Sequence, residues 1–161
     1  AAQLRDEGKS AKEIETALLP MRNNVNMFVT VHNLNALKAA GRVTGSSAFF
    51  GNLLGVKPII YSDTVGNNVP IKKAKGRLNS LKEIVALLKE GVSGFDAPTV
   101  FIAHADCEDE AKEVAAMVKE EIPGASPYIA YIGPIIGASI GADAIGVFAY
   151  GNSIERFSAC R

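Results

Sequence analysis

TVFIAHADCEDEAKEVAAMVKEEIPGASPYIAYI, residues 99–132, is the stretch that decides the fold class. With the apolar run after it, it predicts a strand at 99–103, a helix at 107–121 and strands at 127–132 and 144–148. The first strand has no polar alternation, so we expect it to be covered on both faces, and we expect the two later strands to be buried as well. Asp106 is placed to cap the helix. Strands that alternate with helices in this way indicate an α/β fold.

The segments before residue 99 extend this sheet. They predict strands at 25–31, 57–61 and 69–73, the last two joined as a hairpin by the turn 63–68, and helices at 34–40 and 77–90. The helix at 77–90 is the clearest, because its apolar residues recur at three- and four-residue steps and Gly91 follows it. The predicted fold class is therefore α/β, with a mixed β-sheet flanked by helices.

The chain divides into three parts by sequence. Residues 25–151 form one α/β domain, and residues 152–161 form a tail. Residues 1–24 are polar and helix-forming, with Ser10 and Glu13 spaced for a capping box. Because the chain begins inside a helical pattern without a cap, we expect it to start part-way through a larger protein.

Composition excludes several classes of function. The 161 residues carry 17 Lys and Arg against 17 Asp and Glu, so no overall charge favours nucleic acid or an anionic membrane. The two cysteines, Cys107 and Cys160, form no CxxC pair, which fits a reducing, cytoplasmic setting without disulfides or a zinc site. The apolar run 128–150 is long enough to span a bilayer, but proline, glycines and Asp143 interrupt it, so we expect no membrane span.

A few residues could carry chemistry. His104 closes a predicted strand at its carboxyl end, where it could bind an anion or simply bond to a backbone carbonyl. Arg42 follows a helix end, where it could clamp an anion or bond to the terminal carbonyls. Lys72, Lys73, Lys75 and Arg77 form a basic run that is either a solvated face or a contact with an anion or a protein partner.

Three glycines, Gly133, Gly137 and Gly141, recur every four residues beside Pro134. On a helix this spacing lets a backbone or a slim ligand approach closely. The stretch lacks the G-x-G-x-x-G and P-loop patterns, so we expect no nucleotide cofactor. We also expect no metal site at His32 and no reactive thiol at Cys107. No self-contained catalytic set is recognisable from the residues alone.

Five ordered segments resemble the DegV-like fatty-acid-binding proteins of bacteria. They are LNALKAAGRV, NLLGVKPII, PIKKAKGRLNSLKEIVALL, FIAHAD and YIGPIIGASIGADAIGVFAYG, and together they cover residues 34–151. The resemblance is to the carboxy-terminal domain of such proteins, and it implies a long-chain fatty acid held between this domain and an amino-terminal one that supplies hydroxyl groups to the carboxylate. It also implies that residues 1–24 are the helical connector from that amino-terminal domain, which lies outside this sequence. It also implies a binding subunit, not an enzyme, that presents the acyl chain to a separate fatty acid kinase catalytic subunit.

The resemblance also implies which residues bind the lipid. Those expected at the lipid are Arg42, Phe50, His104, Gly133, Pro134, Ile135, Gly137 and Ser139. Ser139 stands where the family commonly has a histidine near the acyl headgroup, and Ala142-Asp143 replaces Pro-Gly. Candidates for the acyl wall, each of which could equally be plain core, are Phe49, Phe50, Leu53, Ile59, Ile102, Ile132, Ile135, Ile136 and Val147. The lysines of the basic run and Arg77 are the expected contacts with the kinase subunit.

Two other classes of function stay open at this point. One is a small-molecule transferase or hydrolase that uses His104, oriented by Asp106, although no nucleophile or second base stands at a fixed spacing. The other is a structural or interaction domain whose glycine face docks a partner.

Overall fold

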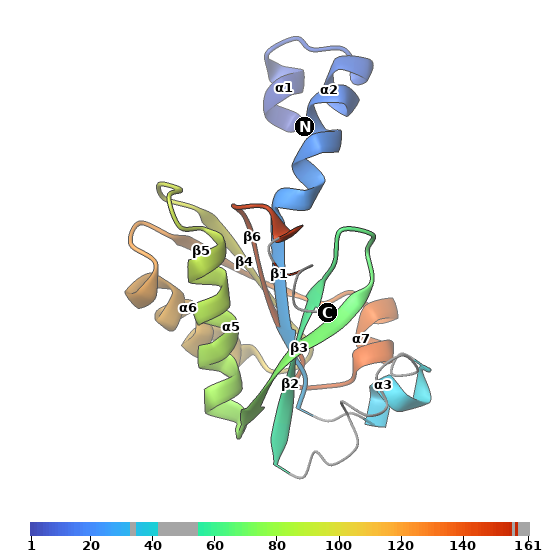
Figure 1. The fold of residues 1–161 in the computed structure, drawn as a ribbon, viewed down its shortest axis with the longest axis vertical. Coiled ribbons are helices and arrows are strands. Elements are labelled where there is room, and N and C mark those ends of the chain that lie inside the picture. Colours follow the sequence, from blue (N-terminus) through green and yellow to red (C-terminus); the bar gives the residue numbers. More distant parts are fainter. Residues whose placement is uncertain (33–34, 42–54, 156, 158–161) are drawn as a thin grey trace.

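A six-stranded mixed sheet organises the protein. The structure is a computed structural model that describes residues 1–32, 35–41, 55–155 and 157 (Figure 1). The strand order is β3-β2-β1-β6-β4-β5. Only β4 and β5 pair in parallel among these neighbours, and the other pairs are antiparallel. The predicted fold class, α/β with a mixed sheet and flanking helices, is confirmed.

The elements lie close to the positions that the sequence predicts. The strands are β1 (Val25–Thr30), β2 (Val56–Ser62), β3 (Asn68–Lys75), β4 (Thr99–His104), β5 (Ser126–Tyr131) and β6 (Ile145–Tyr150). The helices are α1 (Ala2–Asp6), α2 (Ala11–Leu18), the 3-10 helix η1 (Leu19–Asn24), α3 (Asn35–Ala39), α5 (Arg77–Gly91), α6 (Glu108–Glu121) and α7 (Pro134–Ile140).

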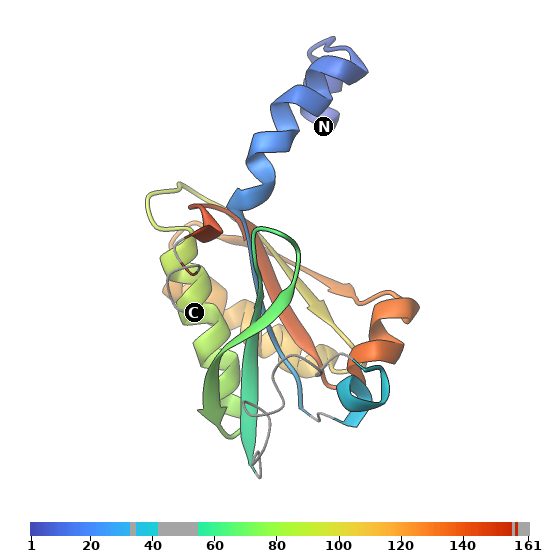
Figure 2. The same cartoon turned by 45° about the vertical axis from the view of Figure 1, so that its right-hand side comes forward.

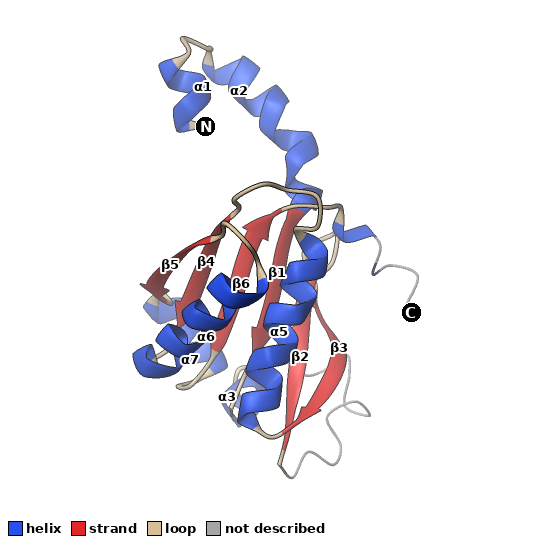
Figure 3. Cartoon of the chain, turned by 90° about the vertical axis from the view of Figure 1, so that its left-hand side faces the viewer, coloured by secondary structure: helices blue, strands red, loops and turns tan. Residues whose placement is uncertain are grey.

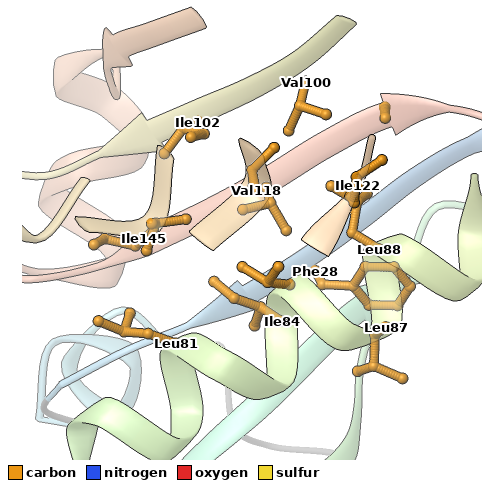
Figure 4. Close-up of a cluster of buried hydrophobic side chains, with 14 of the residues drawn as sticks. Phe28, Leu81, Ile84, Leu87, Leu88, Val100, Ile102, Val118, Ile122 and Ile145 are labelled. Atoms are coloured by element: carbon orange, nitrogen blue, oxygen red, sulfur yellow. The ribbon is translucent and has the colours of Figure 1, made fainter. Parts of the chain in front are cut away.

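The main core lies between one face of the sheet and the helices α5 and α6 (Figure 3). Ile84 and Leu88 of α5 meet Phe28 of β1, and Val118 of α6 lies over the strands, all without exposed surface (Figure 4). Burial of these side chains stabilises the fold by about 2 kcal/mol each before entropy is counted. The apolar stripe of the predicted helix 77–90 is therefore the face that builds the core.

The opposite face of the sheet is only partly covered. Figure 2 shows α3 and α7 together over one end of it. Along β4 the residues alternate, with Val100 and Ile102 buried and Phe101 51% exposed. The prediction that this strand is covered on both faces is therefore wrong, because α5 and α6 lie on one face only. The prediction that residues 127–132 form a buried strand is also wrong, because β5 is an edge strand with Tyr128 59% exposed.

An arm of short helices precedes the sheet. Figure 1 shows α1 and α2 standing clear of the strands, joined to β1 through η1. The predicted capping box is present, since the Ser10 hydroxyl accepts from the Glu13 amide and the Glu13 carboxylate accepts from the Ser10 amide. At the base of the arm, the Asn24 amide side chain donates to the carbonyl of Gly151, which fastens the arm to the end of β6.

Candidate functional site

The loops that follow β1, β4 and β5 meet at one end of the sheet. These three strands run in the same direction, because β1 and β4 both pair antiparallel with β6, and β5 is parallel to β4. Their carboxyl ends therefore share one edge, which is where α/β proteins commonly bind ligands. The helices α3 and α7 lie over this end, above a small second core that contains Val31, Leu37, Ile60 and Ala144. This end of the sheet is the candidate site.

The helix α7 presents its glycines in three different ways. Gly133 caps the helix at its start, Gly137 lies inside it, and Gly141 follows its end with φ +83°. A Cβ added at Gly133 or Gly137 would meet no atom of the described residues within 4 Å, whereas one at Gly141 would come within 2.8 Å of the Cβ of Ala36. Among the described residues, the expected close approach to a neighbouring element therefore occurs at Gly141 and not at the other two glycines.

Two isoleucines on α7 are unusually open for apolar side chains. Ile135 is 83% exposed and Ile136 is 56% exposed. On the same helix, the Ser139 hydroxyl donates to the carbonyl of Ile135 at 3.1 Å. Gly133, Pro134, Ile135, Gly137 and Ser139, the neighbouring residues that the resemblance assigns to the lipid, lie in α7 or at its N-cap.

A row of large apolar residues crosses the face of the sheet opposite α5 and α6, in the part that no described helix covers; we call this the uncovered face. Tyr128, Phe101, Phe148 and Met27 stand opposite one another on the adjacent strands β5, β4, β6 and β1. We call these four residues the open row. Tyr128 and Phe101 pack edge to face with ring centroids 5.7 Å apart. Sequence reasoning missed the open row, because Phe101 lies in an all-apolar strand that looks the same whether one face or both are covered.

Small residues lie beside the open row on the side of α7. Ala103 of β4 pairs with Ala130 of β5 and with Gly146 of β6. Each of these three residues lies two positions along its strand from a residue of the open row. Side chains two residues apart share a face of a strand, so these three residues lie on the same uncovered face. Ala103 and Ala130 therefore keep the surface between the open row and α7 apolar, whereas the space above Gly146 is filled by the Phe148 ring and the Val29 side chain.

Other predicted wall residues belong to the covered face. Ile59, Ile102 and Val147 have no exposed surface and lie in the core under α5 and α6. These three residues are therefore part of the core and not of an acyl wall, which is the alternative that the sequence left open. Ile132 packs beside the second core. Arg42, Phe49, Phe50 and Leu53 lie outside the described residues.

His104 lies at the predicted end of β4 but faces inward. Its side chain is 1% exposed, and its Nδ1 accepts a hydrogen bond from the Cys107 amide at 3.3 Å. Its ring centroid lies 4.4 Å from that of Tyr131. The imidazole therefore helps to fix the start of α6. Its role is structural, as in the second alternative that the sequence left open, but its partner is a backbone amide and not a backbone carbonyl. A buried imidazole used in this way does not favour the transferase or hydrolase alternative.

Asp106 does not cap α6 as predicted. The helix starts at Glu108, its N-cap residue is Cys107, and Asp106 has φ +56°, in the left-handed region. The neighbouring Ala105 explains the difference. Its amide donates to the carbonyl of Ala144 and its carbonyl accepts from the amide of Asp143, so the chain is tied to the loop before β6 and has to turn at Asp106.

Arg77 points into the fold rather than along the basic run. Its Nη2 donates to the Glu110 carboxylate and to the carbonyl of Asp143, both at 2.6 Å. Lys72 forms an exposed ion pair with Glu83 at 2.6 Å. Nothing in the sequence signals the internal role of Arg77, because its partners lie 33 and 66 residues away.

Cys107 is a half-buried thiol whose Sγ lies 3.6 Å from the carbonyl of Ala144. Burial raises the pKa of this thiol to about 11, against the opposing charge of Arg77. A thiol with a raised pKa is a poor nucleophile at neutral pH. Within residues 1–32, 35–41, 55–155 and 157, no group of three or more His, Cys, Asp or Glu side chains could hold a metal ion. In the same ranges, no helix is long and apolar enough to cross a membrane.

Comparisons with known proteins agree on one family. The family model described as "Uncharacterised protein, DegV family" matches residues 1–152. A DegV domain-containing protein of Clostridium perfringens is 36% identical over 155 residues, which cover 96% of the chain and 53% of that protein. The chain spans about half the length of the curated relatives it matches.

Several solved structures with the same fold have fatty acids or lipids in their descriptions. The crystal structure of DegV from Bacillus subtilis, described as a fatty acid binding protein, has a TM-score of 0.78 at 30% identity, covering 94% of this chain and 54% of that one. A DegV-family structure from Ruminococcus gnavus, refined with vaccenic acid, has a TM-score of 0.80 at 26% identity, covering 91% of this chain and 52% of that one.

Proposed function

Because the chain belongs to the DegV family, we propose that it is one half of a long-chain fatty-acid carrier and supplies the apolar wall for the acyl chain. The single observation that supports this most is the uncovered apolar surface that runs from the open row to α7. Phe101, Tyr128 and Ile135 each leave more than half of their surface in water. A contiguous apolar surface of this kind usually marks a binding site.

The energetics suit a long acyl chain. Each methylene group withdrawn from water contributes about 0.8 kcal/mol, so a sixteen-carbon chain gains on the order of 10 kcal/mol before the costs of binding. No atom of the described residues lies within 4 Å of a Cβ built on Gly133 or Gly137, which leaves room for such a chain along α7. The half-buried alanines Ala103 and Ala130 offer it an apolar surface on the sheet.

We assign the carboxylate to the end of this surface that lies at α3 and α7. Gly41 comes shortly after α3 and has φ +67°, and Arg42 is the next residue in the chain. The guanidinium of an arginine suits a carboxylate. Ser139 on α7 offers a neutral hydroxyl. His104 supports this end from beneath, by holding the start of α6.

The rest of the carrier lies in an amino-terminal domain. We propose that residues 1–24 are the connector to that domain, residues 25–151 the lipid-binding domain and residues 152–161 a tail. The arm of α1, α2 and η1 leaves the sheet away from α3 and α7, which suits a connector (Figure 1). The amino-terminal domain would cover the open row and supply hydroxyl groups to the carboxylate.

Calorimetry with palmitate tests this function. We expect residues 1–161 alone to bind palmitate more weakly than micromolar, because the hydroxyl groups of the amino-terminal domain are missing, and we expect the two-domain protein to bind it at micromolar affinity or tighter. Micromolar binding by residues 1–161 alone would place the whole headgroup site within this chain. A two-domain protein that binds no fatty acid would refute the function.

The finer role is that of a cytoplasmic carrier that presents the acyl chain to a fatty acid kinase catalytic subunit. Lys72, Lys73 and Lys75 on the edge strand β3 are the proposed contacts, because a basic edge attracts an acidic partner surface. Reversing Lys73 and Lys75 to Glu leaves the Lys72–Glu83 pair in place. This change should slow association with the kinase subunit and flatten its salt dependence, whereas reversing Lys9 and Lys12 on the arm should not.

A further inference from the structure

One arginine joins two helices to the loop that ends the candidate site. Arg77 is the first residue of α5, and its Nε lies 3.1 Å from both carboxylate oxygens of Glu110 on α6. Its Nη2 donates to Glu110 and also to the carbonyl of Asp143, each at 2.6 Å. The Arg77 side chain is 13% exposed. These contacts fasten the loop of residues 141–144, between α7 and β6, to the helices on the other face of the sheet.

The fastened loop has a backbone that needs support. Asp143 has φ +61°, in the left-handed region that a residue with a Cβ rarely adopts. Its amide donates to the carbonyl of Ala105 at 2.7 Å, and its own carbonyl is the one that Arg77 holds. Gly141, at the other end of the loop, is the point where α7 touches α3. The position of α7 therefore depends on how firmly this loop is held.

Stability alone does not account for a guanidinium at this place. The Nη1 of Arg77 is buried without a hydrogen-bond partner among the described residues. An unpaired buried donor is unfavourable, and buried ion pairs are often no more stable than apolar side chains of similar size. What the arginine offers is a planar fork, which can hold a carboxylate and a carbonyl in fixed directions at once.

We propose that Arg77 is a positioning residue for the lipid site, which holds the 141–144 loop and thereby sets α7 against α3 in the geometry that receives the acyl chain. This inference rests on the proposed fatty-acid function. It adds a residue that touches no ligand and lies on the helix-covered side of the sheet.

Hydrogen exchange on ligand-free residues 1–161 tests the clamp by itself. In Arg77→Met, and in Arg77→Lys, amides 141–144 should exchange about tenfold faster, since a hydrogen bond to a charged group is lost, while amides in the middle of α5 and α6 keep their rates. The control is Lys89→Met, which also breaks an ion pair between α5 and α6, with Glu121, far from the loop. Unchanged exchange at 141–144 in both Arg77 variants would overturn the proposal.

A rescue separates positioning from general stability. In the Arg77→Met background, Asp143→Gly should restore slow exchange, because glycine adopts φ +61° without strain. Asp143→Ala removes the same carboxylate but keeps a Cβ, so it should not restore it. Rescue by both or by neither would contradict a clamp that works by holding the left-handed backbone.

The ligand part is tested with palmitate in the two-domain protein. Arg77→Met should weaken palmitate binding about tenfold, in step with the loss of one charge-assisted contact at the loop, and Asp143→Gly should recover most of it. Equal affinity of wild type and Arg77→Met would overturn the positioning role even if the exchange changes. Absence of palmitate binding by the wild type would instead refute the proposed function, and the exchange measurement would still decide whether the clamp exists.

Discussion

Gly141 and Ala36 are so close that a Cβ built on the glycine would lie 2.8 Å from the Cβ of the alanine. Real Cβ contacts do not reach this distance, so α7 and α3 can meet only because residue 141 has no side chain. The same glycine has φ +83°, which a side chain would also disfavour. The two helices at this end of the sheet therefore form one unit, joined at this point.

Gly141→Ala should lower the free energy of unfolding by about 2 kcal/mol or more, because the left-handed backbone and the contact with Ala36 both oppose a Cβ. Gly133→Ala is the matched control, since Gly133 has φ −58° and a Cβ there would meet no atom of the described residues within 4 Å. Urea unfolding of both variants measures the difference. Equal stability of the two would mean that α7 does not meet α3 as described.

Ile135→Asp should weaken palmitate binding by about tenfold while leaving the unfolding midpoint nearly unchanged, because Ile135 is 83% exposed and has little core to lose. Leu78→Asp is the control on the other side of the sheet, since Leu78 is a half-exposed apolar residue of α5. Calorimetry on the two-domain protein compares them. Similar losses for both variants would show that α7 has no special place in binding.

Ser139→His should tighten fatty-acid binding by roughly 1 kcal/mol at about pH 6, because a charged imidazole forms a stronger bond to a carboxylate than a neutral hydroxyl does. The gain belongs to the protonated ring, so it should fade as the pH rises past the imidazole pKa. Ser139→Ala, which removes only the bond to the carbonyl of Ile135, is the control for the helix. Affinity of Ser139→His that does not change between about pH 6 and pH 8 would place residue 139 away from the headgroup.

Cys107 should react slowly with iodoacetamide at about pH 8, because burial raises the pKa of its thiol to about 11. The raised pKa also makes stability depend on pH. The folded protein keeps this proton where the unfolded chain has lost it, so the contribution is complete below the ordinary thiol pKa and is lost as the pH rises toward about 11. The rate of Cys107 alkylation as a function of pH, in a Cys160→Ser background, measures the thiol pKa. A midpoint at the ordinary thiol value would show that the thiol is not desolvated.

Elements with local determinants could be predicted from the sequence. The Ser10 capping box needs only residues three apart, and the apolar stripe of α5 needs only helical spacing, so both are present as predicted. These features depend on neighbours in the chain, which the sequence displays directly.

Features that depend on distant partners could not be predicted. Phe101 is exposed because no described helix covers its end of the sheet, and the adjacent Val100 is buried by helices elsewhere in the chain. Arg77 looked like part of a basic run, but Glu110 and Asp143 draw it inward. Asp106 is a residue type that commonly caps helices, but the hydrogen bonds between Ala105 and the loop before β6 give it a left-handed conformation instead.

The central claim, that an acyl chain lies between the uncovered face of the sheet and α7, is tested most directly by photo-crosslinking. A palmitate analogue with a diazirine near its methyl end would be bound to the two-domain protein, irradiated and mapped by peptide mass spectrometry. The account predicts labels on the open row or on α7, at residues such as Phe101, Tyr128 and Ile136, which competing palmitate removes. Specific labels on the outer surfaces of α5 and α6, with none on the open row or α7, would contradict it.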